Sequence, residues 1–335
     1  MAYVSTDTSG SFDRDMNYID DRVLDDPTSS WPLAAGRYRL IGARACPWAH
    51  RAIITRQVLG LDSALSLGIA GPTHDWKSWT FDLDPDSVDP VLGVGRLRDC
   101  YLHRYRDYPK GITVPALVDI ESKAVVTNDF RTMVTDFATE WAPLHREGAP
   151  DLYPEALRPE IDEISSLVFH TVNNGVYKCG FAGTQVAYEK AFGELFDTLD
   201  MLEQRLGAQR YLVGEHITLA DIYLYVTLVR FDMVYHGHFK CNRYKISEQP
   251  NLWGYLRDLF QTPGFGDTTN FQQIKDHYYI VHADVNPTGI VAIGPDPAGF
   301  HEPHDRGRFG GSPFGTATIP SPPRKEDVRP GDERL

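Results

Sequence analysis

The first half of the chain alternates short strand-like patterns with helical ones. Residues 37–43 alternate polar and apolar side chains, which predicts a strand, and residues 65–69 predict a second strand. Between them, Pro47 opens a helical stretch that Gly60 ends, because proline suits the first turn of a helix and glycine the position after its last turn. The pattern therefore begins with a strand, a helix and a strand.

A hairpin and a helix complete this block after a long irregular stretch over about residues 71–111. Residues 114–119 and 124–126 are rich in valine and are separated by a short polar turn, which predicts two paired strands. A helix is expected over about residues 129–141. This order of elements is typical of a thioredoxin-like domain, which we place at residues 36–141.

The next block has helical periodicity, and we place an all-helical domain at residues 150–294. Thr218 is followed three residues later by Asp221, directly before an apolar run, which is the pattern of a capping box at a helix start. Elsewhere one apolar stripe recurs at steps of four and three residues, as one face of a helix requires. Its members are Tyr188, Phe192, Leu195, Leu199, Leu202 and Leu206.

Both ends of the chain are poor in apolar anchors. Residues 1–35 are polar and acidic, and we expect an extended arm. Residues 295–335 hold eight of the 23 prolines and six of the 28 glycines. Such a segment buries too little apolar surface to offset the entropy of ordering it, so we expect a tail that drapes over the surface or is disordered.

Composition excludes several classes of function. The chain has 46 acidic and 33 basic residues, whereas a protein that follows a nucleic-acid backbone is normally basic. No run of 18 apolar residues could span a membrane, and the N-terminus has neither the basic nor the apolar region of a signal peptide. We therefore expect a cytoplasmic protein that binds neither nucleic acid nor a membrane.

One of the four cysteines is a candidate nucleophile. Cys46 stands at the turn from the first predicted strand to the helix that Pro47 opens. There its sulfur faces the unpaired N–H groups and the positive end of the helix dipole, which favours the thiolate. His50 and Arg51 add positive charge nearby. The sequence thus predicts a reactive thiol of lowered pKa.

The remaining cysteines do not extend this site. No two cysteines form a Cys-x-x-Cys pair, so no zinc knuckle is built from neighbours, and we expect no metal. Ala49 stands where a dithiol motif would carry its second cysteine. A single thiolate that forms a mixed disulfide, which a second external thiol then resolves, fits this arrangement. His236 and His238 lack a third ligand at useful spacing and are interpreted as structural.

The segment Ala-Cys-Pro-Trp-Ala-His-Arg at 45–51 resembles the signature of S-glutathionyl-hydroquinone reductases, the Xi class of glutathione transferases. Further segments match in the same order over about residues 36–306, including Asn-Asn-Gly-Val-Tyr-Lys-Cys-Gly-Phe-Ala at 173–182 and Asn-Pro-Thr-Gly-Ile at 286–290. The resemblance implies a glutathione-transferase fold, a thioredoxin-like domain followed by a helical one, and usually a homodimer.

The resemblance also implies roles for single residues. A quinol carrying a thiol adduct gives up its sulfur to Cys46 and leaves as free hydroquinone, while Tyr177, Tyr235 and Tyr278 line the quinol pocket. Trp79 packs on the thiol co-substrate. The backbone of Val114, which precedes a proline expected to be cis, bonds to that co-substrate. Supporting positions are Pro47, Trp48, His50, Arg51 and Pro115.

The sequence departs from the family where a γ-glutamyl group would bind. The family has Asn-Glu-Ser after the hairpin, and this chain has Asn128-Asp129-Phe130. Losing one hydrogen bond to a charged group costs about 1.5–3 kcal/mol. Either backbone N–H groups still bind glutathione, or the co-substrate is another small thiol. Mycothiol, a sugar-linked cysteine without a γ-glutamyl group, is the alternative that we favour, with Asp129 and Phe130 in contact with it.

Two other functions stay open from sequence. One is a general dethiolating enzyme or glutathione transferase of omega-like type, in which the quinol pocket is incidental. The other is a non-catalytic binding protein with a transferase fold. The three tyrosines argue against the first, and a thiol at a helix start argues against the second.

Overall fold

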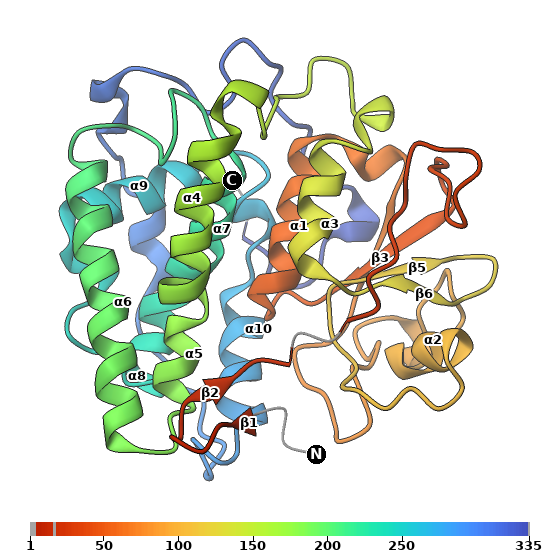
Figure 1. Cartoon of the computed structure of the whole chain (residues 1–335), viewed down its shortest axis with the longest axis horizontal. Helices are drawn as coiled ribbons and strands as arrows, with labels where there is room; N and C mark the ends of the chain where they lie inside the picture. Colours follow the sequence, from red (N-terminus) through yellow and green to blue (C-terminus); the bar gives the residue numbers. More distant parts are fainter. Residues whose placement is uncertain (1–4, 16–17, 334–335) are drawn as a thin grey trace.

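The computed structural model describes residues 5–15 and 18–333, which form an α/β domain beside a helical domain (Figure 1). The α/β domain is built on a sheet of order β4-β3-β5-β6. β4 runs parallel to β3, whereas β5 and β6 are antiparallel to their neighbours. The strands are β3 (Tyr38–Gly42), β4 (Ser66–Ile69), β5 (Ala116–Asp119) and β6 (Val125–Thr127).

Helices cover both faces of this sheet. Leu40 and Leu117 belong to the apolar cluster that includes α1 (Pro47–Val58) and α3 (Phe130–Ala138), which lie side by side in Figure 1. On the other face, Ile41 and Val118 pack in the cluster that includes the buried side chains of α2 (Leu97–Arg104). Side chains alternate along a strand, so each strand supplies both clusters. The predicted thioredoxin-like arrangement is confirmed.

Helix α2 lies inside the stretch that the hydrophobic pattern predicted to be irregular. Leu97, Cys100 and Tyr101 are the buried residues of this eight-residue helix, and its other side chains are mostly polar or charged. So short a helix with few apolar positions gives almost no periodic signal. Tertiary packing against the sheet stabilises α2, and local pattern does not reveal it.

The second domain is helical, as predicted. Helix α7 lies at the centre of this domain, and nearly every residue in it is buried. The predicted capping box is present at its start, where the Asp221 carboxylate accepts a hydrogen bond from the Thr218 N–H at 2.8 Å. The helices of this domain are α4 (Arg158–Val168), α5 (Gly175–Gly180), α6 (Gln185–Leu206), α7 (Leu219–Arg230), α8 (His236–His238), α9 (Pro250–Phe260) and α10 (Phe271–Asp276).

The N-terminal arm contacts both domains. Its described part contains an antiparallel pair, β1 (Ser5–Thr6) and β2 (Phe12–Asp13). Further along, the Ile19 carbonyl accepts the Asn128 N–H at 3.0 Å, so the arm extends past the edge of the sheet beside β6. The segment that was expected to be an extended arm therefore contains a hairpin, formed by β1 and β2.

The proline- and glycine-rich tail packs on the surface through polar contacts. Asp332 pairs with Arg44 at 2.8 Å, and Asp327 pairs with Arg56 at 2.9 Å, with all four side chains almost fully buried. The Arg306 guanidinium donates to the Leu206 carbonyl at 2.7 Å. The tail therefore drapes over the molecule, and ion pairs and carbonyl contacts compensate for its small apolar area.

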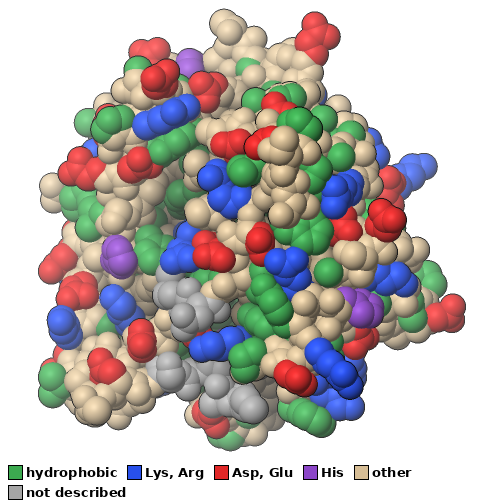
Figure 2. All heavy atoms as spheres, turned by 45° about the vertical axis from the view of Figure 1, so that its right-hand side comes forward, with side chains coloured by type: hydrophobic (Ala, Val, Ile, Leu, Met, Phe, Trp, Pro, Cys, Tyr) green, Lys and Arg blue, Asp and Glu red, His purple; other side chains and the backbone are tan. Residues whose placement is uncertain are grey.

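The surface has a mixed charge distribution. Lys and Arg side chains are interspersed with Asp and Glu side chains over the face in Figure 2. In the described parts of the chain, no helix has both the length and the apolar content that a membrane span needs. Among the same residues, no group of three or more His, Cys, Asp or Glu side chains is placed to hold a metal ion.

Candidate active site

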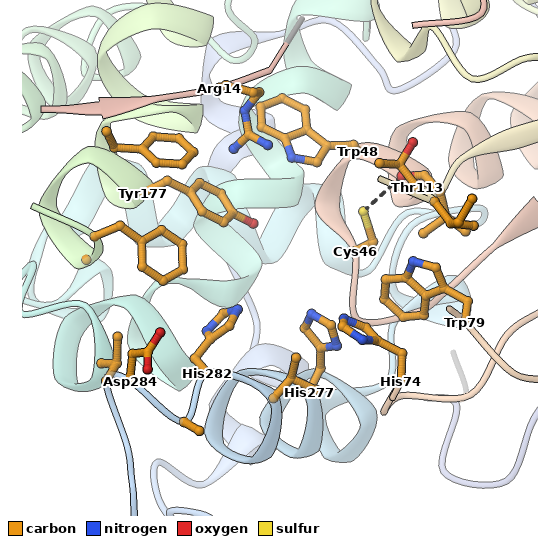
Figure 3. A pocket seen from close by; sticks show the side chains of 18 of the residues that line it. Arg14, Cys46, Trp48, His74, Trp79, Thr113, Tyr177, His277, His282 and Asp284 are labelled. Carbon is orange, nitrogen blue, oxygen red and sulfur yellow. Dashed lines mark hydrogen bonds between the residues drawn. The ribbon is translucent and has the colours of Figure 1, made fainter. Parts of the chain in front are cut away.

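A cavity of about 700 Å³ lies where the two domains and the N-terminal arm meet (Figure 3). Cys46 and Trp48 line it from the start of α1, Phe130 from α3 and Tyr177 from α5. Trp79 and Val114 also line the cavity, so many of the residues that the sequence analysis selected converge here. His50, Arg51, Asp129, Tyr235 and Tyr278 are not among the lining residues, nor are Pro47 and Pro115.

Cys46 is the N-cap residue of α1, as the sequence predicted. It has extended backbone, Pro47 follows at the first helical position, and the residue is partly exposed. Its Sγ lies 3.4 Å from the Val114 carbonyl oxygen, to which the thiol donates. The Val114–Pro115 peptide bond is cis, as the resemblance implied. The cysteine thus faces the cavity at a helix start.

The prediction of a lowered pKa for Cys46 is wrong for the protein without substrate. Burial raises the pKa of this thiol, and that effect is larger than the opposing ones. The backbone N–H groups of Ala49 and Trp48 and the charges of Arg230 and Arg14 act in the other direction. The sequence reveals the helix start but not the burial of the sulfur. Because burial raises the pKa of Cys46, the resting sulfur is a thiol at neutral pH.

His50 does not add charge to the site, contrary to expectation. Its Nδ1 accepts from the Arg230 guanidinium at 3.2 Å, so Nε2 carries the proton and donates to the Thr268 hydroxyl at 2.9 Å. Burial and the neighbouring arginines hold the pKa of His50 well below its ordinary range. The buried imidazole is neutral and joins α1 to the helical domain.

Arg51 is a cation of the interior. Burial lowers its pKa to about 10, which leaves it charged at neutral pH. Its guanidinium bonds to the Asn173 amide oxygen at 2.5 Å and lies over the rings of Trp48 and Tyr223. Arg51 therefore holds the Trp48 ring in place by packing against it, and it forms no hydrogen bond with the Cys46 sulfur.

Arg230, at the end of α7, holds the turn that carries Cys46. Its guanidinium donates to the Arg44 carbonyl at 2.6 Å and to the Ala45 carbonyl at 3.1 Å. The side chain is fully buried. Sequence reasoning missed this role because the contact joins residues 185 positions apart in the chain.

The three tyrosines form one hydrogen-bonded chain. The Tyr278 hydroxyl lies 2.5 Å from that of Tyr177 and 2.8 Å from that of Tyr235. Tyr177 lines the cavity, while Tyr235 and Tyr278 are fully buried behind it. Burial raises the pKa of all three phenols, so they carry their protons at neutral pH. A quinol in the cavity can contact this chain through Tyr177.

Wide helical turns position these tyrosines. π-Helical turns span residues 231–235 and 277–281, which contain Tyr235 and Tyr278. A third, at 169–173, ends one residue before the helix of Tyr177 begins. Such turns are rare and occur often at functional sites. They carry no sequence signal that composition or periodicity detects.

Histidines form the wall opposite Tyr177, together with Trp79 (Figure 3). The His277 ring stacks on Trp79 at a centroid distance of 5.1 Å, and its Nδ1 donates to the Pro72 carbonyl at 2.7 Å. His282 bonds to His238 at 3.1 Å. Burial lowers the pKa of His277 to about 3 and that of His238 to about 4. This neutral wall was not predicted from sequence.

Phe130 occupies the start of α3. Its ring packs 4.5 Å from Trp48 and edge-on to Tyr18 at 5.5 Å, and it is almost fully buried. Asp129, the N-cap, does not face the cavity. Its carboxylate accepts from the Arg131 backbone N–H at 3.0 Å and from the Arg131 guanidinium at 2.7 and 2.8 Å. Arg131 thus engages the Asp129 carboxylate in this arrangement, and a contact between Asp129 and a thiol co-substrate stays a prediction.

The α/β domain, the helical domain and the cavity between them define the class of glutathione transferases. The family model for the glutathione S-transferase C-terminal domain matches residues 185–258. A glutathione transferase from Gordonia bronchialis superposes with a TM-score of 0.92 at 60% identity, covering 94% of this chain and 98% of that one. A Xi-class enzyme from Natrialba magadii superposes with a TM-score of 0.84 at 39% identity, covering 92% and 98%.

A curated relative defines the family further. The glutathionyl-hydroquinone reductase YqjG of Escherichia coli is 41% identical over 317 residues, which is 92% of this chain and 96% of the relative. Its glutathione-bound structure superposes with a TM-score of 0.81, covering 86% of this chain and 96% of that one. The chain belongs to the glutathionyl-hydroquinone reductases, the Xi-class glutathione transferases, and is an enzyme.

Proposed function

We propose that the protein reduces S-conjugated hydroquinones through a mixed disulfide on Cys46. The observation that carries the proposal is the position of Cys46 at the start of α1, in one cavity with Tyr177. The name of the relative YqjG, a glutathionyl-hydroquinone reductase, supports the same reaction.

The first step cleaves the bond between carbon and sulfur. The conjugate reacts as its keto tautomer, in which the carbon that bears sulfur has gained a proton. The Cys46 thiol first loses its proton to water. The thiolate then attacks the sulfur, a sulfur–sulfur bond forms, and the electron pair of the broken bond becomes the phenolate of the hydroquinone. The N–H groups of Trp48 and Ala49 and the charge of Arg230 stabilise the thiolate that reacts.

The tyrosine chain moves the proton that forms the keto tautomer: Tyr177 gives a proton to the ring carbon that bears sulfur, and the chain recovers one from the phenol hydroxyl of the conjugate. Positioned acids typically accelerate such proton transfers about 10²- to 10⁴-fold. Tyr177 stands at the cavity wall, and Tyr278 and Tyr235 relay the proton behind it. A second thiol, reacting as its thiolate, then attacks the outer sulfur of the mixed disulfide. This releases a disulfide of the two small thiols and the Cys46 thiolate, which takes up a proton to return to the resting thiol.

Mycothiol is the proposed second thiol. Two contacts support this choice over glutathione: Phe130 packs on Trp48 where a serine hydroxyl would assist a γ-glutamyl carboxylate, and Arg131 engages both Asp129 oxygens. A thiol rich in sugar hydroxyls needs neither group. A cytoplasmic location and a homodimer are parts of the same proposal, since the reaction consumes a reduced thiol and the family resemblance implies a dimer.

The test compares the two thiols at equal concentration with one synthetic hydroquinone conjugate. We expect mycothiol to resolve the Cys46 mixed disulfide faster than glutathione. Equal or faster turnover with glutathione would reject mycothiol and leave the glutathione-dependent reductase. Comparable rates on a simple disulfide and on the conjugate would instead favour an omega-like dethiolating enzyme.

A further inference from the structure

The N-terminal hairpin is seated on the helical domain. The Gly183 N–H donates to the Gly10 carbonyl at 2.8 Å, and the Thr184 hydroxyl donates to the Ser9 carbonyl at 3.0 Å. Gly10 has a φ of +81°, and a Cβ there would lie 2.7 Å from the Thr184 side chain, so this approach requires glycine. The hairpin is therefore a fitted part of the site.

This seating brings Arg14 into the cavity wall. Phe12 packs its ring against Tyr177 and Phe181, at centroid distances of 6.3 and 5.7 Å. Two positions later, the Arg14 Nε donates to the Asn174 amide oxygen at 2.8 Å. The guanidinium lies 4.6 Å from the Trp48 ring centroid and 4.8 Å from that of Tyr177. Figure 3 shows Arg14 between these two rings.

One nitrogen of Arg14 is left without a partner. Its NH2 atom is buried and has no hydrogen bond, although a guanidinium nitrogen donates two. Among the described residues, no carboxylate forms an ion pair with Arg14. A buried donor without an acceptor is unfavourable, and neither the packing nor the anchoring bond to Asn174 requires it. The unused donor therefore points to a ligand oxygen.

A guanidinium carries a positive charge and only hydrogen-bond donors, so the unused donor of Arg14 suits a negatively charged oxygen. The Asp284 carboxylate also lines the cavity, but it lies across the cavity from Arg14, beside His282 (Figure 3). The rings of Trp48 and Tyr177, on either side of Arg14, also line the cavity, and such aromatic walls suit a flat ring. Arg14 and Cys46 line the same cavity, and the charge of Arg14 acts electrostatically on both Cys46 and Tyr177.

We propose that Arg14 binds an oxyanion on the ring of the quinol conjugate. This inference rests on the proposed function. The oxyanion has two possible sources: the phenolate that forms as the carbon–sulfur bond breaks, or a carboxylate substituent on the ring. A fixed donor aimed where charge develops typically changes turnover about 10²- to 10³-fold, because it needs no reorganisation during the reaction.

The test replaces Arg14 and compares three substrates. Arg14→Gln removes the charge, and Arg14→Lys keeps it with a different geometry. Arg22→Gln is the matched control, because Arg22 belongs to the same arm and pairs with Asp136 outside the cavity. The substrates are an unsubstituted hydroquinone conjugate, a carboxylated one and a small disulfide, and thermal unfolding of each variant is measured alongside.

If Arg14 binds the phenolate, Arg14→Gln lowers kcat about 10²-fold on both conjugates, Arg14→Lys restores part of it, and disulfide reduction changes less than about threefold. If it binds a carboxylate, KM rises for the carboxylated conjugate alone. Equal loss on the disulfide, or unchanged kinetics on both conjugates, overturns the inference. A wild-type enzyme that reduces the disulfide but neither conjugate refutes the proposed function instead.

Discussion

Replacing Phe130 by serine should shift the thiol preference toward glutathione. The hydroxyl would restore one hydrogen bond to a charged γ-glutamyl group, worth about 1.5–3 kcal/mol, which is about a ten- to a hundredfold gain in affinity. The ring is almost fully buried against Trp48 and Tyr18, so its removal should also lower the free energy of unfolding by about 3–5 kcal/mol. Thermal unfolding must therefore be measured first.

The assay follows the second half of the reaction. The mixed disulfide on Cys46 is prepared, glutathione or mycothiol is added, and the release of the small disulfide is timed. Phe130→Ala is the matched control, because it opens the same space without a hydroxyl. Adding Asp129→Glu to Phe130→Ser should extend the shift. If the alanine variant gains as much as the serine variant, or if neither gains, the hydrogen-bond explanation of thiol choice is wrong.

Three further predictions concern other parts of the molecule. Tyr177→Phe should reduce turnover of quinol conjugates about 10²-fold while a small disulfide reacts almost unchanged; equal losses would mean that Tyr177 maintains the fold. Because burial raises the pKa of Cys46, its alkylation by iodoacetamide should keep accelerating above the pKa of a free cysteine; a plateau below about pH 7.5 would contradict this. Asp327→Ala leaves Arg56 buried without its partner and should lower the unfolding free energy by about 3–5 kcal/mol in urea, whereas Arg324→Ala, at an exposed pair, should cost under about 1 kcal/mol; similar costs would contradict the importance of burial.

Much of the α/β domain was predictable because its elements are locally determined. Strand β3 and helix α1 follow from alternation, Pro47 and Gly60, and the capping box of α7 follows from Thr218 and Asp221. The hydrophobic pattern did not predict helix α2, because its apolar positions are few and it packs on the other face of the sheet. Where tertiary packing alone stabilises an element, its own sequence carries little signal.

In the candidate site, too, some features could be predicted from sequence and others could not. The position of Cys46 could be predicted from the strand, the proline and the helix that follow one another. Its pKa could not, because the desolvation that raises it depends on segments far away in sequence. The same holds for Arg230 and Arg14, which reach the site from α7 and from the N-terminal arm. Single residues that act over such separations leave no pattern in a single sequence.

Amino-acid composition predicted only part of how the C-terminal tail packs. Its proline and glycine content predicts little apolar burial, and that holds for most of its length. Sequence did not reveal that Asp327 and Asp332 meet the buried arginines Arg56 and Arg44. Arg44 also lies two positions before Cys46, so the tail supports the turn that carries Cys46.

The central claim is that Cys46 takes the sulfur from the conjugate, and intact mass measured after a single turnover tests it most directly. Wild-type protein mixed with one equivalent of a hydroquinone conjugate, without a second thiol, should gain the mass of the small thiol on Cys46 as one equivalent of hydroquinone is released. Cys46→Ser should do neither, because an alcohol stays protonated near neutral pH and forms no mixed disulfide. Hydroquinone release by Cys46→Ser at more than a few per cent of the wild-type rate would contradict the account.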